Sequence, residues 1–327
     1  MTTIPLPPLP STDPPDDAWE EAGGRRRLVV ASGGRLDKVL ATLLPEHSRS
    51  RLQGWIEAGF VAVNGRPEQS VRRAVSAGDR LDVAEQATPE QLAFSAEPVE
   101  FSVVAESHHW LVVDKPVGLV VHPGAGNWSG TLLNGLLHRY PELRQVARAG
   151  IVHRLDKDTS GLMVVARTEI AQTSLVRQLQ ERTVGREYVA LAQGQLWREQ
   201  TLDWPIGRDA RVPVRMSASH PVAAKPAITH VVPERQGMLG TRAVTRVACR
   251  LETGRTHQIR VHLAQAGHPL VADLLYGGSR LAPAQRQMLH ARRLAFDDPL
   301  DGGSRVFESS LPADMQAVFA AVHWNDA

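Results

Sequence analysis

The sequence contains little that would allow covalent cross-linking or insertion into a membrane. Its single cysteine, Cys249, permits no disulfide within the chain, which agrees with a reducing, cytoplasmic compartment. No apolar run reaches the roughly 18 residues that a membrane-spanning helix requires. The first ten residues include four prolines and lack the basic start and apolar centre of a secretory signal. We therefore expect a cytoplasmic protein without a membrane segment.

Lysine is also scarce, because the 37 basic residues are nearly all arginine and lysine occurs only at positions 38, 115, 157 and 225. Arginine binds phosphate through two parallel hydrogen bonds and stacks on bases, so this choice suits a protein that binds RNA. A biased nucleotide composition of the gene would enrich arginine equally well. The net charge of +2 does not by itself indicate a nucleic-acid-binding protein.

What is present is a chain of 327 residues with 43% hydrophobic and 22% charged residues, which is typical of a globular protein with about two domains. Residues 1–27 are rich in proline and acidic residues and are predicted to be a disordered leader. Residues 28–85 are predicted to form a small domain and residues 86–100 a linker. Residues 101–327 are predicted to form a larger domain.

The pattern of the small domain predicts two helices followed by a β-hairpin. Apolar residues recur at helical spacing over residues 36–44, and Pro45 ends that helix. A second helix is expected to begin at Ser48 or Ser50, either of which can cap it, and to end at Gly59. The strands and turn of the hairpin are expected at residues 60–63, 64–65 and 78–83.

The larger domain combines predicted strands with predicted helices. The strands are expected at residues 101–105, 110–113, 186–191 and 247–251. The helices are expected at residues 131–140 and 169–182, with a third that Thr256 caps. Residues 207–230 have weak periodicity and are predicted to be a long mobile loop, whose arginines could close over a nucleic-acid backbone.

Charge is concentrated in the middle of the chain, in residues 151–166 (Ile-Val-His-Arg-Leu-Asp-Lys-Asp-Thr-Ser-Gly-Leu-Met-Val-Val-Ala). Two apolar runs flank a polar centre, which predicts two buried strands joined by a loop, with Gly161 supplying backbone freedom. A loop held between buried strands is a common place for chemistry. The same composition is also that of an ordinary turn.

The string from His153 to Leu162 resembles the catalytic motif of the RluA-type pseudouridine synthases, in which the first Asp is the nucleophile. This resemblance nominates Asp156. Arg186-Glu187-Tyr188 resembles the family motif whose aromatic residue stands in the active site, and this nominates Tyr188. Residues 251–262 resemble a third family motif, which implies Arg255 as the partner of the catalytic Asp and Ile259 as an apolar wall of the uridine pocket.

Two further resemblances concern binding and support. Lys115-Pro116 and the residues up to Pro123 resemble a family motif that braces the catalytic loop. The small domain resembles an S4 RNA-binding domain in several phrases, among them Arg35-Leu36-Asp37-Lys38 and Val61-Ala62-Val63-Asn64-Gly65. Its implied RNA-binding residues are Lys38, Arg49, Arg51, Arg72 and Arg73. Acidic residues are interspersed among them, so these charges could instead only solvate one face.

The resemblance implies an α+β protein in which the S4 domain precedes a mixed, mainly antiparallel sheet with flanking helices. The implied reaction is the isomerisation of uridine to pseudouridine in RNA, most like the branch that modifies a stem-loop of 23S rRNA. Nothing is oxidised and no atom is lost, so neither a cofactor nor a metal is expected. Asp156 could attack the sugar C1′, attack the base C6, or remove the ribose 2′ proton.

The resemblance also assigns Arg154 to the space that the flipped-out uridine vacates, and Tyr188 to stacking on the base. Among other functions, a synthase for tRNA or another rRNA site differs only in its target. A non-catalytic RNA-binding factor for ribosome assembly is a second alternative, and the chain is expected to be a monomer. A metal site is disfavoured, because His257 and His262 point to different faces at a spacing of five.

Overall fold

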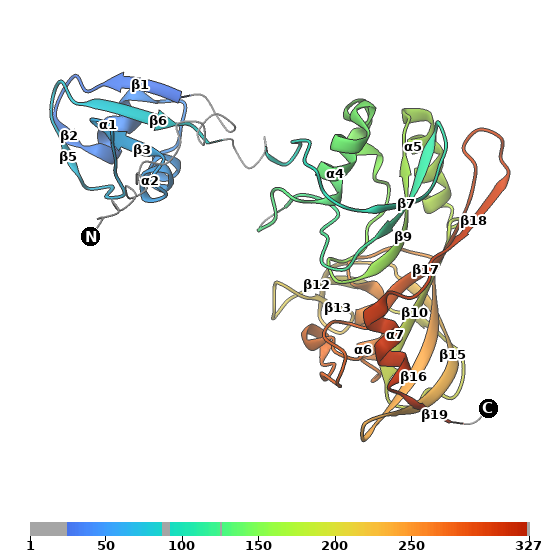
Figure 1. The fold of residues 1–327 in the computed structure, drawn as a ribbon. Helices are drawn as coiled ribbons and strands as arrows, with labels where there is room; N and C mark the ends of the chain where they lie inside the picture. The colour runs from blue at the N-terminus through green and yellow to red at the C-terminus, as the bar shows by residue number, and fades with distance from the viewer. Residues whose placement is uncertain (1–24, 87–91, 125, 326–327) are drawn as a thin grey trace, which may run out of the picture. The chain divides into compact units, whose positions relative to one another are not determined.

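The structure is a computed structural model that describes residues 25–86, 92–124 and 126–325. It divides into two compact units, and the second begins at Ala93 (Figure 1). Each unit has its own buried apolar core. Within the described residues, no helix is both long enough and apolar enough to cross a membrane.

The first unit contains the predicted helix pair and hairpin. Its elements are β1 (Arg25–Val29), β2 (Gly34–Arg35), α1 (Leu36–Leu43), α2 (Arg49–Glu57), β3 (Val61–Val63), β4 (Arg66–Pro67), β5 (Ala74–Val75) and β6 (Arg80–Ala84). Ser48 caps α2 by accepting a hydrogen bond from the backbone N–H of Arg51. Asn64 and Gly65 both have positive φ, which the tight turn between β3 and β4 requires.

The boundaries of this unit differ from the prediction. Arg25, Arg26 and Arg27 were expected to belong to the leader, but they lie in β1 and pair with β6. The rest of that leader, residues 1–24, lies outside the described residues. The predicted linker also ends earlier, because Ala93 is buried in the second unit, where its carbonyl accepts a hydrogen bond from the side chain of Asn134.

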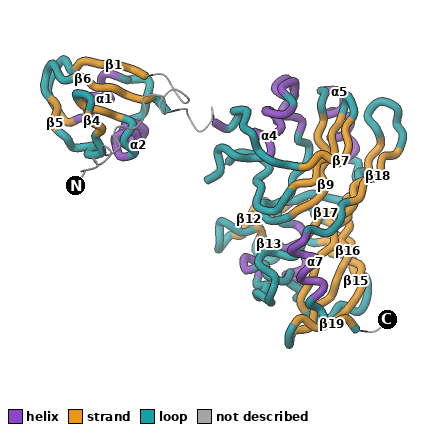
Figure 2. The backbone as a smooth tube through the Cα atoms, in the orientation of Figure 1, coloured by secondary structure: helices purple, strands orange, loops and turns teal. Residues whose placement is uncertain are grey.

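The second unit is built on one ten-stranded sheet with the strand order β11-β15-β16-β10-β17-β9-β8-β7, to which β18 and β19 add at β17 and β15. Figure 2 shows its strands in orange. Its strands are β7 (Ser102–Glu106), β8 (Trp110–Lys115), β9 (Ser160–Ala166), β10 (Gly185–Gln193), β11 (Gln200–Asp203), β15 (Ile228–Leu239), β16 (Arg242–Leu251), β17 (Leu289–Asp297), β18 (Ser304–Glu308) and β19 (His323–Trp324). The pair β9 and β17 is parallel and the other pairs are antiparallel. The predicted fold class, α+β with a mixed and mainly antiparallel sheet, is confirmed.

Helices cover both faces of this sheet. They are α4 (Leu132–Arg139), α5 (Glu169–Gln180), α6 (Gln258–Gln265) and α7 (Ala313–Ala320). Successive residues of a strand point to opposite faces. Tyr188 and Ala190 of β10 therefore belong to the core under α4 and α6, whereas Val189 and Leu191 belong to the core under α7. The catalytic motif lies on the face of α4 and α6.

Three local predictions for this unit are wrong. The first apolar run of the central stretch forms only an isolated bridge between Ile151 and Val165, not a strand. Residues 207–230 are not a structureless loop, because they form β12 (Ile206–Asp209), β13 (Met216–Ser217), β14 (Pro221–Lys225) and the start of β15. Helix α6 begins one residue later than expected, with His257 and not Thr256 at the N-cap.

Candidate active site

The loop that carries Asp156 is fixed by a buried lysine from the end of β8. Lys115 is fully buried, and its Nζ donates to the backbone carbonyls of Pro116, Leu119 and Lys157 at 2.8 to 2.9 Å. Burial lowers the pKa of Lys115 to about 8, against the opposing effect of nearby aspartates. The three carbonyls replace the water that this ammonium group loses. The residue after Asp156 is thereby held in place.

A second buried cation holds the other side of the loop. Arg286 donates to the carbonyl of Asp158 at 2.9 Å, and its Nε forms an ion pair with Asp314 at 2.7 Å. Gly161, where the loop enters β9, has φ +114°, and a Cβ there would lie 2.3 Å from the carbonyl oxygen of Ala291. The loop therefore requires glycine at this position, as the sequence predicted.

Asp156 is the first member of a chain of charges. Its Oδ2 accepts a hydrogen bond from Nη1 of Arg260 at 3.0 Å, and its side chain remains 15% exposed. Arg260 is held from behind by Asp273, to which it donates through Nε at 2.7 Å and Nη2 at 2.9 Å. These two carboxylates raise the pKa of Arg260, although burial opposes them. The guanidinium is thus a fixed positive charge beside Asp156.

This arrangement corrects the predicted pairing of Arg255 with Asp156. Arg255 is half-buried as a whole, and its Nε donates to the carbonyl of Pro226 at 3.0 Å. The arginine beside the carboxylate is Arg260, the third residue of α6. Arg255 precedes the N-cap of α6 and is therefore outside the helix that directs Arg260 toward the loop.

A histidine faces the second oxygen of the carboxylate. Nε2 of His257 lies 3.8 Å from Oδ1 of Asp156, and its Nδ1 lies 2.6 Å from the hydroxyl of Tyr276. The ring of Tyr276 also packs against the guanidinium of Arg260, with 4.9 Å between the ring centre and Cζ. Burial lowers the pKa of His257, although the charge of Asp156 opposes this shift.

These groups border a cleft of about 620 Å³, within the range of pockets that bind small organic groups. Arg154 is exposed and lines it together with Asp156. The charged lining residues are Arg154, Asp156, Lys157, Asp158, Arg260, Asp273 and Arg286. Cations and carboxylates are therefore mixed in one hollow, as expected of a site that holds a phosphate-bearing substrate and performs acid–base chemistry.

Tyr188 and Ile259 do not line this cleft. Both are at least 95% buried, in the apolar cluster that also contains Leu155, the neighbour of Asp156. Burial raises the pKa of Tyr188 to about 12, against Arg186 and with a contribution from Asp156. The phenol thus keeps its proton at neutral pH. An aromatic and an aliphatic side chain together support the apolar side of the site.

The other polar residues of the motifs serve the fold. His153 is half-buried, accepts the backbone N–H of Val164 at Nε2, and has a pKa that burial and Arg186 lower to about 3. Burial lowers the pKa of His122 to about 4, with help from Arg148 and Arg154. Burial raises the pKa of the Cys249 thiol to about 12. None of these three groups changes its charge near neutral pH.

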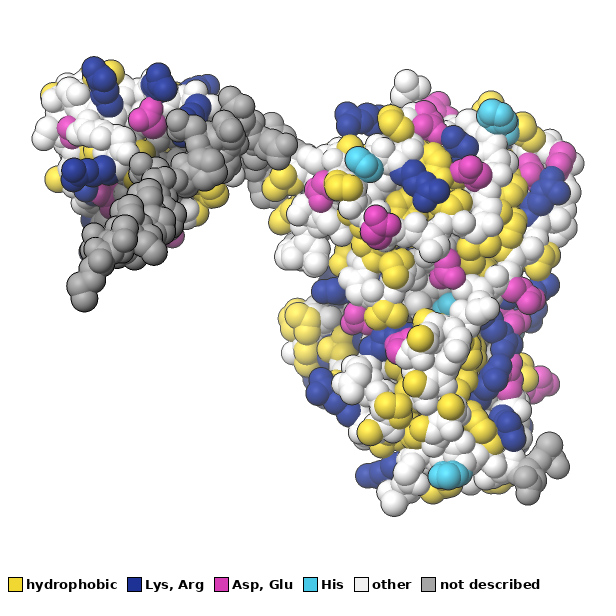
Figure 3. Space-filling view, viewed as in Figure 1, with side chains coloured by type: hydrophobic (Ala, Val, Ile, Leu, Met, Phe, Trp, Pro, Cys, Tyr) yellow, Lys and Arg dark blue, Asp and Glu magenta, His cyan; other side chains and the backbone are white. Residues whose placement is uncertain are grey.

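The five predicted RNA-binding residues of the first unit differ in exposure and in whether an acid pairs with them, and Arg49 and Arg73 are paired although they are exposed. Lys38 and Arg72 are exposed. Arg49 donates to the fully buried Asp37 at 2.6 Å, and Arg73 pairs with Glu68 at 2.6 Å. Arg51, the fifth predicted residue, is half-buried. On the face in view, dark blue basic side chains are accompanied by acidic ones (Figure 3).

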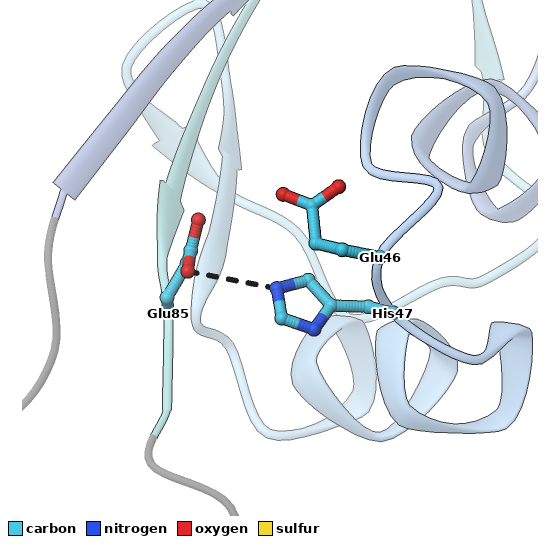
Figure 4. Close-up of side chains that lie close together, drawn as sticks. All are labelled: Glu46, His47 and Glu85. Carbon is cyan, nitrogen blue, oxygen red and sulfur yellow. Dashed lines mark ion pairs between the residues drawn. The ribbon is translucent and has the colours of Figure 1, made fainter.

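One other cluster in the first unit has the composition of a metal site. Glu46, His47 and Glu85 bring possible ligand atoms within 4.8 Å of one another (Figure 4). Arg26 reaches both carboxylates, with 2.6 Å to Glu46 and 2.7 Å to Glu85. A guanidinium in this position repels a cation and already neutralises the acids. The cluster is therefore explained as an ion-pair network between β1, β6 and the turn before α2.

Four residues of the site were missed in the sequence: His257, Arg260, Asp273 and Tyr276. One signal could have identified Arg260, since apolar Ile259 and Val261 flank it in the predicted helix, and an arginine that is buried requires an acidic partner. Asp273 and Tyr276 belong to the turn around the short helix η4 (Leu274–Tyr276). No spacing in the sequence connects that turn with the catalytic loop.

Comparison with known proteins agrees with this fold. The family model described as RNA pseudouridylate synthase matches residues 109–265, and the model described as S4 domain matches residues 34–81. A curated protein of Neisseria meningitidis serogroup B is 50% identical over 296 residues, which cover 87% of this chain and 77% of that protein. The chain therefore belongs to the RNA pseudouridylate synthase family, as its motifs predicted.

The Neisseria protein is named Ribosomal large subunit pseudouridine synthase D. So is a protein of Pseudomonas aeruginosa that is 48% identical over 299 residues, covering 86% of this chain and 90% of that protein. Among solved structures, Human RNA Pseudouridylate Synthase Domain Containing 1 matches with a TM-score of 0.57 and 29% identity, covering 74% of this chain and 91% of that one. The expected likeness to the large-subunit branch is confirmed.

Proposed function

We propose that this chain converts specific uridines of large-subunit rRNA to pseudouridine, with Asp156 as the catalytic carboxylate. The observation that carries this proposal is the cleft in which Asp156, held at one oxygen by Arg260, keeps part of its carboxylate open. The substrate is inferred from relatives of 50% and 48% identity whose names refer to the large ribosomal subunit.

The reaction breaks the bond from N1 of uracil to C1′ of ribose and forms a bond from C5 to C1′. The proton of C5 leaves and N1 gains one, so the product is an isomer. A uridine in a folded RNA must first leave its stack, which costs a few kcal/mol. We assign Arg154, exposed at the cleft, to the space that the uridine vacates, and Tyr188 with Ile259 to the apolar side of the base.

Arg260 supplies the charge that keeps Asp156 ionised in a partly enclosed site, because a neighbouring cation favours the carboxylate over the acid. We no longer propose Arg255 for this role. The first unit is assigned to RNA binding, with the exposed Lys38 and Arg72 on phosphates and with Arg49, Arg51 and Arg73 beside them. Attack at C1′, attack at C6 and removal of the 2′ proton are all compatible with the position of Asp156.

The test is a pseudouridine map of large-subunit rRNA from a strain that lacks the gene for this chain. The strain is complemented with the wild-type chain or with Asp156→Ala, and both proteins are quantified in the cell. We expect specific pseudouridines to disappear in the deletion strain and to return only with the wild type. Asp301→Ala is a matched control, since it removes an exposed carboxylate that does not line the cleft.

Other results would exclude parts of the proposal. An unchanged map in the deletion strain would exclude large-subunit rRNA, and tRNA would be mapped next. Restoration of the marks by Asp156→Ala would exclude a catalytic role of that carboxylate. If the deletion impairs assembly of the large subunit and Asp156→Ala corrects this without restoring the marks, the chain also acts as an assembly factor.

A further inference from the structure

His257 occupies a position in the site that no motif resemblance explained. The two oxygens of Asp156 face different residues: Oδ2 is bound by Arg260 at 3.0 Å, and Oδ1 faces Nε2 of His257 at 3.8 Å. A separation of 3.8 Å is longer than a hydrogen bond. Catalytic hydrogen bonds are often long in an unbound enzyme and shorten when the substrate closes the site.

The hydrogen bonds behind the imidazole define where its proton lies. The backbone N–H of Met216 donates to the hydroxyl oxygen of Tyr276 at 3.0 Å, because a backbone N–H can only donate. Among the described residues, Nδ1 of His257 at 2.6 Å is the only acceptor within reach of the hydroxyl hydrogen of Tyr276, so this hydrogen is directed at Nδ1. An Nδ1 that accepts a hydrogen bond leaves the proton of a neutral imidazole on Nε2, which is the atom that faces Asp156.

The backbone of His257 gives independent support. His257 is the N-cap of α6 and has φ +57°, in the left-handed region that is costly for a residue with a Cβ. Its side chain makes no capping hydrogen bond. An imidazole at this position therefore serves something other than the helix.

The surroundings favour the neutral imidazole. Burial lowers the pKa of His257; Asp156 and Asp273 oppose that shift, and Arg260 and Arg154 add to it. The groups that face the imidazole are Asp156 and Arg154 from the catalytic loop, Arg260 from α6, and Asp273 and Tyr276 from the turn after it. A neutral N–H can orient a carboxylate without adding a second positive charge beside it.

We propose that His257 is a positioning residue whose Nε2–H orients Oδ1 of Asp156 toward the bound uridine, and that Tyr276 and the backbone N–H of Met216 fix its tautomer. This inference rests on the proposed role of Asp156. It adds to that role a second contact to the carboxylate. It also connects the small sheet of β12, β13 and β14 to the catalytic residue, since Met216 begins β13.

The experiment measures tritium release from a large-subunit rRNA transcript labelled with [5-³H]uridine, because the C5 hydrogen leaves during the reaction. The full-length chain is compared with His257→Leu, His257→Gln and Tyr276→Phe at several pH values, and each melting temperature is recorded. His257→Gln retains an N–H close to the position of Nε2. The substrate concentration is varied so that kcat and KM are obtained separately.

We expect His257→Leu to lower kcat by about 10- to 100-fold, as for a misplaced catalytic group, with KM changed less than about threefold. His257→Gln should recover part of this loss. Tyr276→Phe removes the hydrogen bond that favours the neutral imidazole, so the pKa of His257 should rise toward its ordinary value. Because a protonated His257 adds a second positive charge beside Asp156 and weakens its reaction, kcat should fall at low pH, and in Tyr276→Phe this fall, the acid limb, should move to higher pH.

Two results would overturn the proposal. One is a His257→Leu protein with wild-type kcat and pH profile, whatever its melting temperature, since the imidazole would then serve stability alone. The other is a folded Tyr276→Phe protein whose acid limb is unchanged. Failure of the underlying function looks different, because the wild-type chain would then release no tritium, or Asp156→Asn would release as much as the wild type.

Discussion

Asp37 in the first unit and Asp156 in the second both bind arginine, and they differ in how much of the carboxylate remains accessible. Asp37 is completely buried and accepts hydrogen bonds from Arg35, Arg49 and Gln53. Burial tends to raise its pKa, but these three donors hold the pKa well below its usual range. Asp156 keeps 15% of its side chain exposed in a cleft.

The difference teaches how a structural acid is told from a chemical one. Asp37 is fully buried and both of its oxygens accept hydrogen bonds, so it is closed to a substrate and serves to join α1 to α2. Asp156 has one firm donor, Arg260, and Arg260 is itself fixed from behind by Asp273. The residues around Asp156 are therefore held rigidly by one another, and the carboxylate itself remains free to react.

The largest expected effect separates the two arginines of the third motif. Arg260→Gln should lower kcat by about 10²- to 10³-fold, the usual loss when one donor to a reacting group is removed. Arg255→Gln should lower it far less, because Arg255 bonds to the carbonyl of Pro226 and not to Asp156. Tritium release measures both. Equal losses in two folded variants would contradict the assignment of Arg260.

Removal of the Lys115 ammonium group, which holds the loop that carries Asp156, should give the next largest effect. Lys115→Met keeps the apolar stem and removes the ammonium group, so the carbonyls of Leu119 and Lys157 lose a donor. A buried unsatisfied carbonyl costs about 1–3 kcal/mol, and we expect the free energy of unfolding to fall by about that amount. Because the loop is loosened, kcat should also fall, by about tenfold. Urea denaturation and tritium release measure the two effects.

A contrary result is as informative. A Lys115→Met protein that loses stability but keeps its full kcat would show that the loop is held by Arg286 alone. The position of Asp158 would then not depend on Lys115, and Arg286→Met should lower kcat.

The structural acid should show the opposite behaviour. Asp37→Ala should destabilise the first unit by about 2–3 kcal/mol, because a broken buried ion pair leaves charges without a partner. The value lies below the usual range since Arg35 and Arg49 are each more than 40% exposed and can turn to water. Urea denaturation of the full chain should show an earlier transition for this unit. If kcat, extrapolated to saturating RNA, fell as far as for Arg260→Gln, the comparison would fail.

The smallest expected effect is the loss of folding stability as the pH falls. The pKa of His153 is about 3 in the folded chain and about 6.5 when unfolded, so the unfolded chain binds a proton first as the pH falls. Stability from this residue is complete above pH 6.5, and about 2 kcal/mol is lost by pH 5. Asp37, whose pKa is lowered, loses its contribution only below its ordinary pKa near 3.8. As the pH falls, the free energy of unfolding of the second unit should therefore decrease before that of the first unit.

Thermal melts between pH 7.5 and 5 check this order. His153→Gln is the matched variant, because its side-chain oxygen can accept the N–H of Val164 and does not titrate. It should show a shallower loss of stability over this range. A slope identical to that of the wild type would mean that another group is responsible.

Local sequence determined the elements and the family. The periodicity of α1 and α2, the cap of α2, and the turn at Asn64 and Gly65 depend on neighbours a few residues away, so they could be predicted. The catalytic motif is a continuous string, and the need for glycine at position 161 could be predicted from it. In each case the physical cause lies within one turn or one loop.

Only the tertiary structure decided how distant residues meet. Arg25–Val29 form a strand because β6, more than fifty residues later, offers an unpaired edge. The partner of Asp156 is Arg260, 104 residues away, since the start of α6 and the turn at Asp273 set the direction of that side chain. A sequence pattern specifies which face of an element is buried, but the group that faces it from another element is fixed only by packing.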